Sequence, residues 1–190
     1  MTEVQIIQYC KQGDSRGFKY LVDTYASKLY GICLRYLGDE FEANDALQEC
    51  FIKIFRNISL YEQTGSFEGW ISRIAVNTSL MALRKRKNRM RFLEPLKEIE
   101  DGFIDSIVES DLNEMEIIGM LKKLPDHYRV IFNLAIIEGF SHSEIAKKLD
   151  IPESTSRTKL TRARKKMQEI YLKEMKTNPI DLKKEIKRTT

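Results

Sequence analysis

Two short segments of this chain concentrate side chains that bind polyanions. From position 157 to 166, six of ten residues are Arg or Lys. From position 84 to 91, six of eight residues are Arg or Lys. Ammonium and guanidinium groups neutralise phosphates, and a guanidinium can also donate two hydrogen bonds to a guanine edge. These residue types indicate two contacts with nucleic acid, although a run of cations can also be only the solvated face or end of a helix.

The charge distribution along the chain supports the same interpretation. The net charge is +4 over 190 residues. Residues 1–93 carry net +4, residues 94–116 carry net −8, and residues 117–190 carry net +8. Two basic blocks that flank an acidic bridge suggest binding to a polyanion at both ends.

Composition excludes several other classes of protein. Charged residues make up 32% and hydrophobic residues 42%, which is typical of a soluble globular chain. No apolar run approaches the roughly 20 residues of a membrane helix, and the N-terminus lacks the pattern of a signal peptide. The three cysteines have no metal-type spacing, and we interpret Cys33 and Cys50 as small buried hydrophobes. We therefore expect a cytoplasmic protein with no membrane insertion.

The second cationic segment belongs to a predicted pair of helices. Gly139 suits the end of a preceding helix, and Ser141 with Glu144 forms a capping box that begins the next one. The sequence from Asp150 to Pro152 should break that helix, so a second helix begins at Glu153 or Ser154. Its apolar seam is predicted to be Leu160, Ala163, Met167 and Ile170. A helix anchored on one side and cationic on the other can enter the major groove of DNA.

Helical periodicity extends over nearly the whole sequence, and no segment alternates as a strand would. Apolar stripes at helical spacing predict helices from Phe18 to Tyr36, from Leu47 to Ile58 and from Trp70 onward, with Gly38 and Ser66 at helix boundaries. We predict an all-α protein of two helical domains, 1–91 and 114–173. An acidic linker, 92–113, joins them, and a basic tail, 174–190, follows.

Two spaced motifs in the first domain complete a recognisable pattern. The first runs Asp45-Ala46-Leu47-Gln48-Glu49-Cys50-Phe51, and the second runs Phe67-Glu68-Gly69-Trp70-Ile71-Ser72-Arg73-Ile74-Ala75-Val76-Asn77 before the cationic segment. With the C-terminal helix pair, they resemble the bacterial sigma-70 family, in its extracytoplasmic-function (ECF) group. One departure is Met81, where members often have an acidic or amide residue. We interpret it as a local change in helix capping.

The resemblance implies three sets of contacts. Core RNA polymerase would bind Asp45, Gln48, Glu49 and Lys53. The −10 promoter element would be bound by Tyr61, Gln63, Ser66, Phe67, Trp70, Asn77, Arg84, Lys85, Arg86 and Lys87. The −35 element would be bound by Ser154, Thr155, Arg157, Thr158, Lys159, Thr161, Arg162, Arg164, Lys165 and Lys166, the lysines and Arg164 on phosphates. The resemblance also implies promoter DNA and an anti-sigma factor as partners.

Elementary chemistry agrees with these roles. An extruded base needs an aromatic pocket and amide donors, which Tyr61, Gln63, Phe67 and Asn77 supply, although Tyr61 and Phe67 could instead only anchor the loop. Opening about ten base pairs at roughly 1.4 kcal/mol per step requires on the order of 14 kcal/mol. A 22.3 kDa protein is too small to offset this alone, so a large partner is expected.

Two other functions fit parts of the sequence. A transcription regulator of the response-regulator type would have a similar helix pair, but it needs an α/β domain in residues 1–91. A metal-dependent nuclease could use Glu42, Asp45 and Glu49 on one helix face, yet no general base or second carboxylate helix supports it. His127 and His142 have no metal-type partners. We expect no enzyme activity, no cofactor, no metal and no small-molecule substrate.

Overall fold

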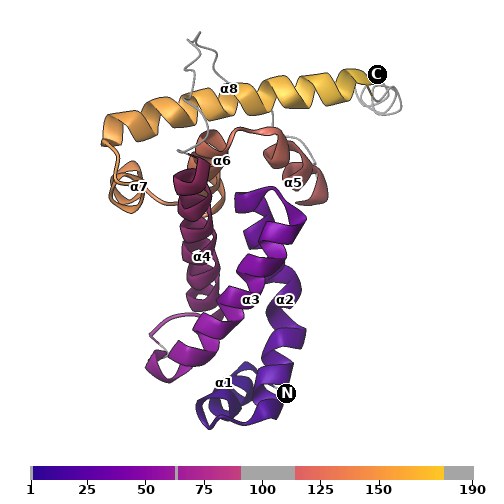
Figure 1. The fold of residues 1–190 in the computed structure, drawn as a ribbon, viewed down its shortest axis with the longest axis vertical. Coiled ribbons are helices and arrows are strands. Elements are labelled where there is room, and N and C mark those ends of the chain that lie inside the picture. Colours follow the sequence, from indigo (N-terminus) through magenta and orange to yellow (C-terminus); the bar gives the residue numbers. More distant parts are fainter. Residues whose placement is uncertain (1, 63, 91–113, 178–190) are drawn as a thin grey trace, which may run out of the picture. The chain divides into compact units, whose positions relative to one another are not determined.

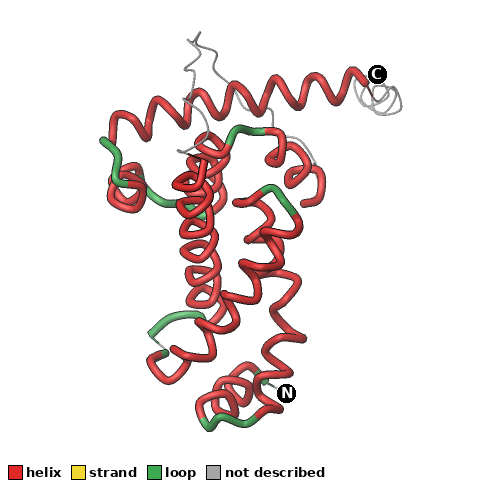
Figure 2. Tube along the Cα trace, in the orientation of Figure 1, coloured by secondary structure: helices red, strands yellow, loops and turns green. Residues whose placement is uncertain are grey.

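The computed structural model describes residues 2–62, 64–90 and 114–177, with the side chains of 87–90, 114 and 175–177 outside the description. These residues are entirely helices, turns and loops, which confirms the prediction of an all-α protein (Figure 2). They belong to two compact units, which divide between Leu96 and Lys97. The predicted linker, which contains most of the acidic bridge, and the last 13 residues of the tail lie outside the described part.

The first unit is a bundle of four α-helices (Figure 1). They are α1 (Glu3–Lys11), α2 (Ser15–Leu37), α3 (Glu40–Asn57) and α4 (Phe67–Met90), with a 3₁₀ turn, η1 (Ile58–Leu60), after α3. The helices α2, α3 and α4 pack on one another through the predicted stripes, and Leu21, Leu29, Ile54 and Ile71 are fully buried. Burial of these stripes stabilises the three-helix arrangement.

The boundaries of these helices follow local chemistry. Gly38 has φ +74, which ends α2 in the left-handed conformation that glycine adopts without strain. The Asp39 carboxylate then accepts from the backbone N–H of Glu42 at 2.9 Å and begins α3. The Ser66 hydroxyl accepts from the N–H of Gly69 at 2.9 Å and begins α4, as predicted.

Three cysteines lie in this unit, and all are buried and free. Burial raises the pKa of the Cys10 thiol to about 11 and that of Cys50 to about 12. Thiols in this state are poor nucleophiles because the thiolate is disfavoured. The structure therefore confirms that Cys33 and Cys50 act as small hydrophobes.

The second unit consists of α5 (Glu114–Lys123), α6 (Asp126–Phe132), α7 (His142–Leu149) and α8 (Glu153–Thr177). A π-helical turn, η2 (Asn133–Ile137), continues α6. The core cluster contains Leu121, Leu124, Phe132 and Ala163, and Met167 and Ile170 pack against it. This arrangement confirms the predicted seam of α8.

One detail of the helices differs from the sequence analysis. Met81 lies in the middle of α4, and its sulfur is 3.9 Å from the Lys53 ammonium. The interpretation of Met81 as a capping change is therefore wrong, because no helix begins or ends there.

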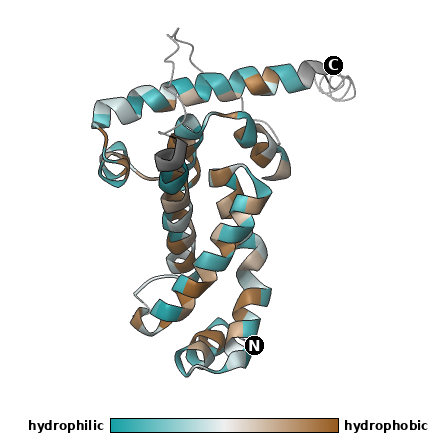
Figure 3. Ribbon diagram, viewed as in Figure 1, coloured by the Kyte–Doolittle hydropathy of each residue, from teal (hydrophilic) through white to brown (hydrophobic). Residues whose placement is uncertain are grey.

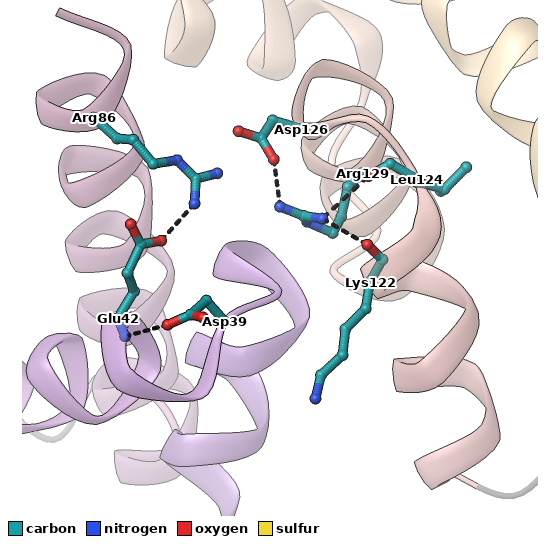
Figure 4. Close-up of polar contacts among 7 residues, drawn as sticks. All are labelled: Asp39, Glu42, Arg86, Lys122, Leu124, Asp126 and Arg129. Carbon is teal, nitrogen blue, oxygen red and sulfur yellow. Dashed lines mark hydrogen bonds and ion pairs between the residues drawn. The ribbon is translucent and has the colours of Figure 1, made fainter. Parts of the chain in front are cut away.

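A buried arginine joins α5 to α6 (Figure 4). Arg129 is 4% exposed, and its guanidinium donates to the carbonyl oxygens of Leu124 at 3.1 Å and Lys122 at 3.4 Å. It also pairs with the Asp126 carboxylate. One side chain therefore satisfies carbonyls that the end of α5 leaves without helical partners.

Substituting Arg129→Met should destabilise the second unit by about 1–3 kcal/mol, because buried carbonyl groups would lose their donor. Hydrogen exchange of peptides from α5 and α6 in the full chain measures the effect. The control is Lys147→Met, which removes an exposed cation from the same unit. Equal exchange in the two variants would contradict the assigned role of Arg129.

Candidate nucleic-acid interface

One strongly basic surface lies on α8, which Figure 3 shows as predominantly hydrophilic. Its buried side is the row Ser156, Leu160, Ala163 and Met167, at spacings that place them on one helix face. The opposite side of the helix carries a second row, which consists of Thr158, Thr161, Arg162 and Lys165. We call Thr158, Thr161, Arg162 and Lys165 the outer row. Thr158 is exposed, whereas the other three side chains are partly buried and the Nε of Arg162 is buried.

The remaining predicted residues of α8 lie on its flanks. One flank carries Arg157 and Arg164, which are seven residues apart. The other flank carries Thr155, Lys159 and Lys166. Arg157 forms an ion pair with Glu153, and Lys166 forms one with Glu169 at 2.9 Å. Ser154 is exposed in the first turn. The sequence analysis grouped Arg157 with Arg162, but Arg157 lies on a flank of the helix. It assigned Lys165 to a phosphate, but Lys165 lies in the same row as Arg162.

The position of α8 depends on α7. The Ser141 backbone N–H donates to the Glu144 carboxylate at 2.8 Å, and the Glu144 N–H donates to the Ser141 hydroxyl at 3.3 Å, which confirms the capping box. Asp150, at φ 55, ends the helix. His142 Nδ1 lies 3.0 Å from the hydroxyl of buried Ser156 and joins the start of α7 to the first turns of α8. The sequence analysis missed this contact.

A second candidate surface lies on α4. Trp70, Asn77 and Arg84 recur every seven residues and share one face, where Asn77 and Arg84 are exposed. Arg73 is exposed between them and was not predicted, although its spacing of four from Asn77 could have revealed it. Lys85 is exposed nearby, and the Lys87 side chain lies outside the described part.

Arg86 has a different position from its neighbours. Its guanidinium forms an ion pair with Glu42 of α3, and its side chain is 19% exposed (Figure 4). The contact joins α3 to α4. It also engages one of the three carboxylates of the nuclease alternative, and the described residues contain no group of three or more His, Cys, Asp or Glu that could hold a metal.

The loop before α4 is supported by buried aromatic rings. Tyr61 and Phe67 are 7% and 0% exposed, and their ring centroids are 5.2 Å apart. Trp70 packs on both rings, and the Tyr61 hydroxyl donates to the Gly65 carbonyl. Of the two roles considered for Tyr61 and Phe67, this burial favours loop anchoring. Gln63 lies outside the described residues.

The acidic residues of α3 lie as the motif suggested. Asp45, Gln48 and Glu49 are exposed, opposite the buried Ala46 and Cys50. Lys53 pairs with Glu49 at 3.5 Å and reaches the Thr78 hydroxyl at 3.3 Å, so it points toward α4. The sequence analysis missed Phe41, which is 84% exposed one turn before Asp45.

Comparison with known proteins identifies both units. The profile of sigma-70 region 2 matches residues 21–89, and that of sigma-70 region 4 matches residues 114–167. The sequence is 34% identical over 170 residues to the ECF RNA polymerase sigma factor SigW of Bacillus subtilis, covering 83% of this chain and 90% of that protein. The chain belongs to the ECF group of the sigma-70 family.

Other relatives agree with this assignment. The RNA polymerase sigma-H factor of Pseudomonas aeruginosa is 31% identical over 173 residues, covering 84% of this chain and 89% of that protein. The fold is similar to that of the Bartonella quintana sigma factor RpoE, solved with the anti-sigma factor NepR, at 21% identity and a TM-score of 0.51; the match covers 81% of this chain and 96% of that one.

Family membership confirms the function predicted from the sequence. The chain is an RNA polymerase sigma factor, a transcription initiation factor that directs promoter recognition. The response-regulator alternative is not favoured, because residues 21–89 match sigma-70 region 2 where that alternative needs an α/β domain. Within the described residues, no helix has both the length and the apolar character to cross a membrane.

The capping box that positions α7 should be sensitive to acid. Hydrogen bonds from the Ser141 hydroxyl and backbone lower the pKa of Glu144 below its ordinary value. Its contribution to stability is thus present above the ordinary pKa and is lost as pH falls through the lowered one. An NMR titration of the Glu144 carboxyl measures this pKa, which should rise in Ser141→Ala. An unchanged pKa in that variant would contradict the capping contact as its cause.

Proposed function

We propose that α8 enters the major groove at the −35 element and that its outer row recognises bases. The observation that carries this proposal is the position of Thr158, Thr161, Arg162 and Lys165 opposite the buried seam. An arginine in such a row can donate two hydrogen bonds to guanine. Thr158 and Thr161 donate to the carbonyls of Ser154 and Arg157, which leaves their methyl groups to contact thymine.

The two flanks of α8 would hold the phosphate backbones on either side of the groove. Arg157 and Arg164 supply one flank, and Lys159 and Lys166 supply the other. Phosphate contacts fix the register of a protein on DNA and add affinity without sequence preference. Ser154 and Thr155, at the start of the helix, suit a phosphate close to its N-terminus.

The surface of α4 would bind the −10 element. Asn77 offers an amide to a base edge, Trp70 offers a ring face, and Arg73, Arg84 and Lys85 offer charge to phosphates. Tyr61 and Phe67 would support the loop through their buried rings, and exposed Ser66 would contact the DNA. Gln63 stays a proposed contact of the −10 element. Because Arg86 pairs with Glu42, we assign it mainly to the position of α4 on α3.

The exposed side of α3 would bind core RNA polymerase. Asp45, Gln48 and Glu49 form its polar centre, and Phe41 adds a large apolar side chain one turn earlier. Aromatic residues, including Phe, are enriched in protein interfaces relative to the rest of the surface. Lys53 would orient Glu49 from the inner edge of this surface.

The remaining assignments concern residues that are mostly outside the described part. The domain limits at residues 91, 113 and 173 stay a proposal, as does the acidic linker as a nucleic-acid mimic inside a basic channel of the polymerase. An anti-sigma factor is a further proposed partner, supported by the complex of the Bartonella quintana sigma factor with NepR.

The proposed role of the acidic linker is tested by deleting residues 94–116. This deletion should change open-complex formation or promoter escape, and unchanged values for both would contradict the role.

Replacing Arg162 with alanine should weaken binding to the preferred −35 sequence by about 1–3 kcal/mol and reduce discrimination at one position. Binding of holoenzyme to a panel of −35 variants measures this. Lys166→Ala is the matched control: it should lower affinity on all sequences and reduce the salt slope by roughly 0.9. If Arg162→Ala weakened every sequence equally, Arg162 would be a phosphate contact.

Reversing the charge of Glu49 should impair polymerase binding without unfolding the chain. Glu49→Lys places a cation in the centre of the α3 surface, where Lys53 already lies 3.5 Å from the carboxylate. Affinity for core polymerase should fall, while the circular dichroism melt stays close to that of the wild type. Asp23→Lys makes the same charge change at an exposed site of α2 and serves as control. Equal affinities for the two variants would remove α3 from the interface.

A further inference from the structure

The first helix of the chain precedes the residues that match sigma-70 region 2, which begin at residue 21. It is nonetheless firmly docked on the first unit. Ile6, Ile7 and Cys10 are buried, and Glu3 accepts a hydrogen bond from the Tyr25 hydroxyl at 2.7 Å. Gly17 permits a close approach of α2, because a Cβ there would lie 2.7 Å from the Cys10 nitrogen. Helix α1 is therefore a fixed support.

The last residue of α1 reaches the loop before α4. The Lys11 ammonium donates to the backbone carbonyl of Tyr61 at 2.7 Å, fifty residues away in the sequence. Tyr61 is the first residue after η1, and its hydroxyl donates to the Gly65 carbonyl. Through Tyr61, α1 is therefore connected both to the start of the loop and to Gly65 near its end.

Within the part of the chain that the structure describes, the Tyr61 carbonyl is the hydrogen-bond partner that explains the position of Lys11. Its stem leaves the exposed side of α1, and no carboxylate pairs with it among the ion pairs of the described residues. A hydrogen bond from a charged donor to a carbonyl is stronger than one between neutral groups. The bond therefore restricts the backbone at the point where the loop begins.

We propose that Lys11 is a positioning residue for recognition of the −10 element. By holding the Tyr61 carbonyl, it fixes the residue where the loop begins, beside Phe67 and Trp70, next to which an unpaired base would bind. This inference rests on the proposed function of the α4 surface and adds α1 to it. Lys11 touches no base in this scheme, so its loss affects discrimination between bases more than overall affinity.

The test compares Lys11→Met with Lys11→Arg in holoenzyme formed with bacterial core polymerase. The DNA is a fork promoter with a single-stranded −10 region in which each non-template base is varied. Lys11→Met keeps an aliphatic side chain but removes the donor, and the ratio of affinities between the best and worst base should fall roughly tenfold. Lys11→Arg keeps a donor and should restore most of the ratio.

A second measurement follows the loop without DNA. Trp70 is the only tryptophan of the chain, and its ring centroid lies 5.4 Å from that of Tyr61. Lys11→Met should shift Trp70 emission to longer wavelength because the aromatic cluster becomes more open to water. Lys19→Met removes an exposed cation of α2 and is the control for the loss of one charge.

The outcomes separate the inference from the proposed function. Unchanged base discrimination and unchanged Trp70 emission in Lys11→Met would overturn the role of Lys11. An equal, base-independent loss of affinity in Lys11→Met and Lys19→Met would also overturn it, since charge alone would explain the result. If wild-type holoenzyme itself showed no preference among bases and Asn77→Ala behaved like wild type, the proposed −10 surface would fail, and the inference with it.

Discussion

The burial of one narrow seam on α8 is the constraint on which the proposed DNA-binding surface of the second unit depends. Ser156, Leu160 and Ala163 are small or moderate in size, so α8 can lie close to the rest of the unit. Because an α-helix is rigid over these turns, fixing the seam also fixes the direction of every side chain opposite it. The geometry of recognition is thus set by apolar packing rather than by the charged residues themselves.

In the first unit, buried packing likewise positions the proposed binding surface, but the packed side chains are aromatic rings instead of small residues. Tyr61, Phe67 and Trp70 form a cluster beneath the loop, and Tyr25 contacts Phe67 from α2. Buried rings of this size contribute large apolar areas with few rotatable bonds. The loop can therefore present polar groups at its surface while its ends stay fixed.

Features that depend on local sequence were predicted well. The capping box of Ser141 and Glu144, the left-handed Gly38 and the seam of α8 each follow from residue type and spacing within one or two turns. Helix α1 was missed because it is only nine residues long and is held by contacts with α2 and η1. The π-helical turn at Asn133–Ile137 likewise has no signature in the sequence.

Contacts between residues that are far apart in the sequence could not be predicted from it. The ion pair of Glu42 with Arg86 joins positions 44 residues apart, and the burial of Tyr61 depends on where α4 begins. Spacing rules could show that Arg86 belongs to a cationic run, but not that it points toward α3. Residue spacing therefore predicted the helices on which these side chains lie, but not which side chains each helix buries against its neighbours.

The ion pairs on the flanks of α8 have a further consequence for DNA binding. Arg157 pairs with Glu153, and Lys166 pairs with Glu169, and all four side chains are about half exposed or more. Exposed pairs of this kind contribute only about 0–1 kcal/mol, so a phosphate can replace either carboxylate with little loss. In the absence of DNA they hold each cation near its flank and reduce repulsion among neighbouring charges. In the proposed complex with DNA, the acidic residues of α8 would therefore compete only weakly with phosphates for its cations.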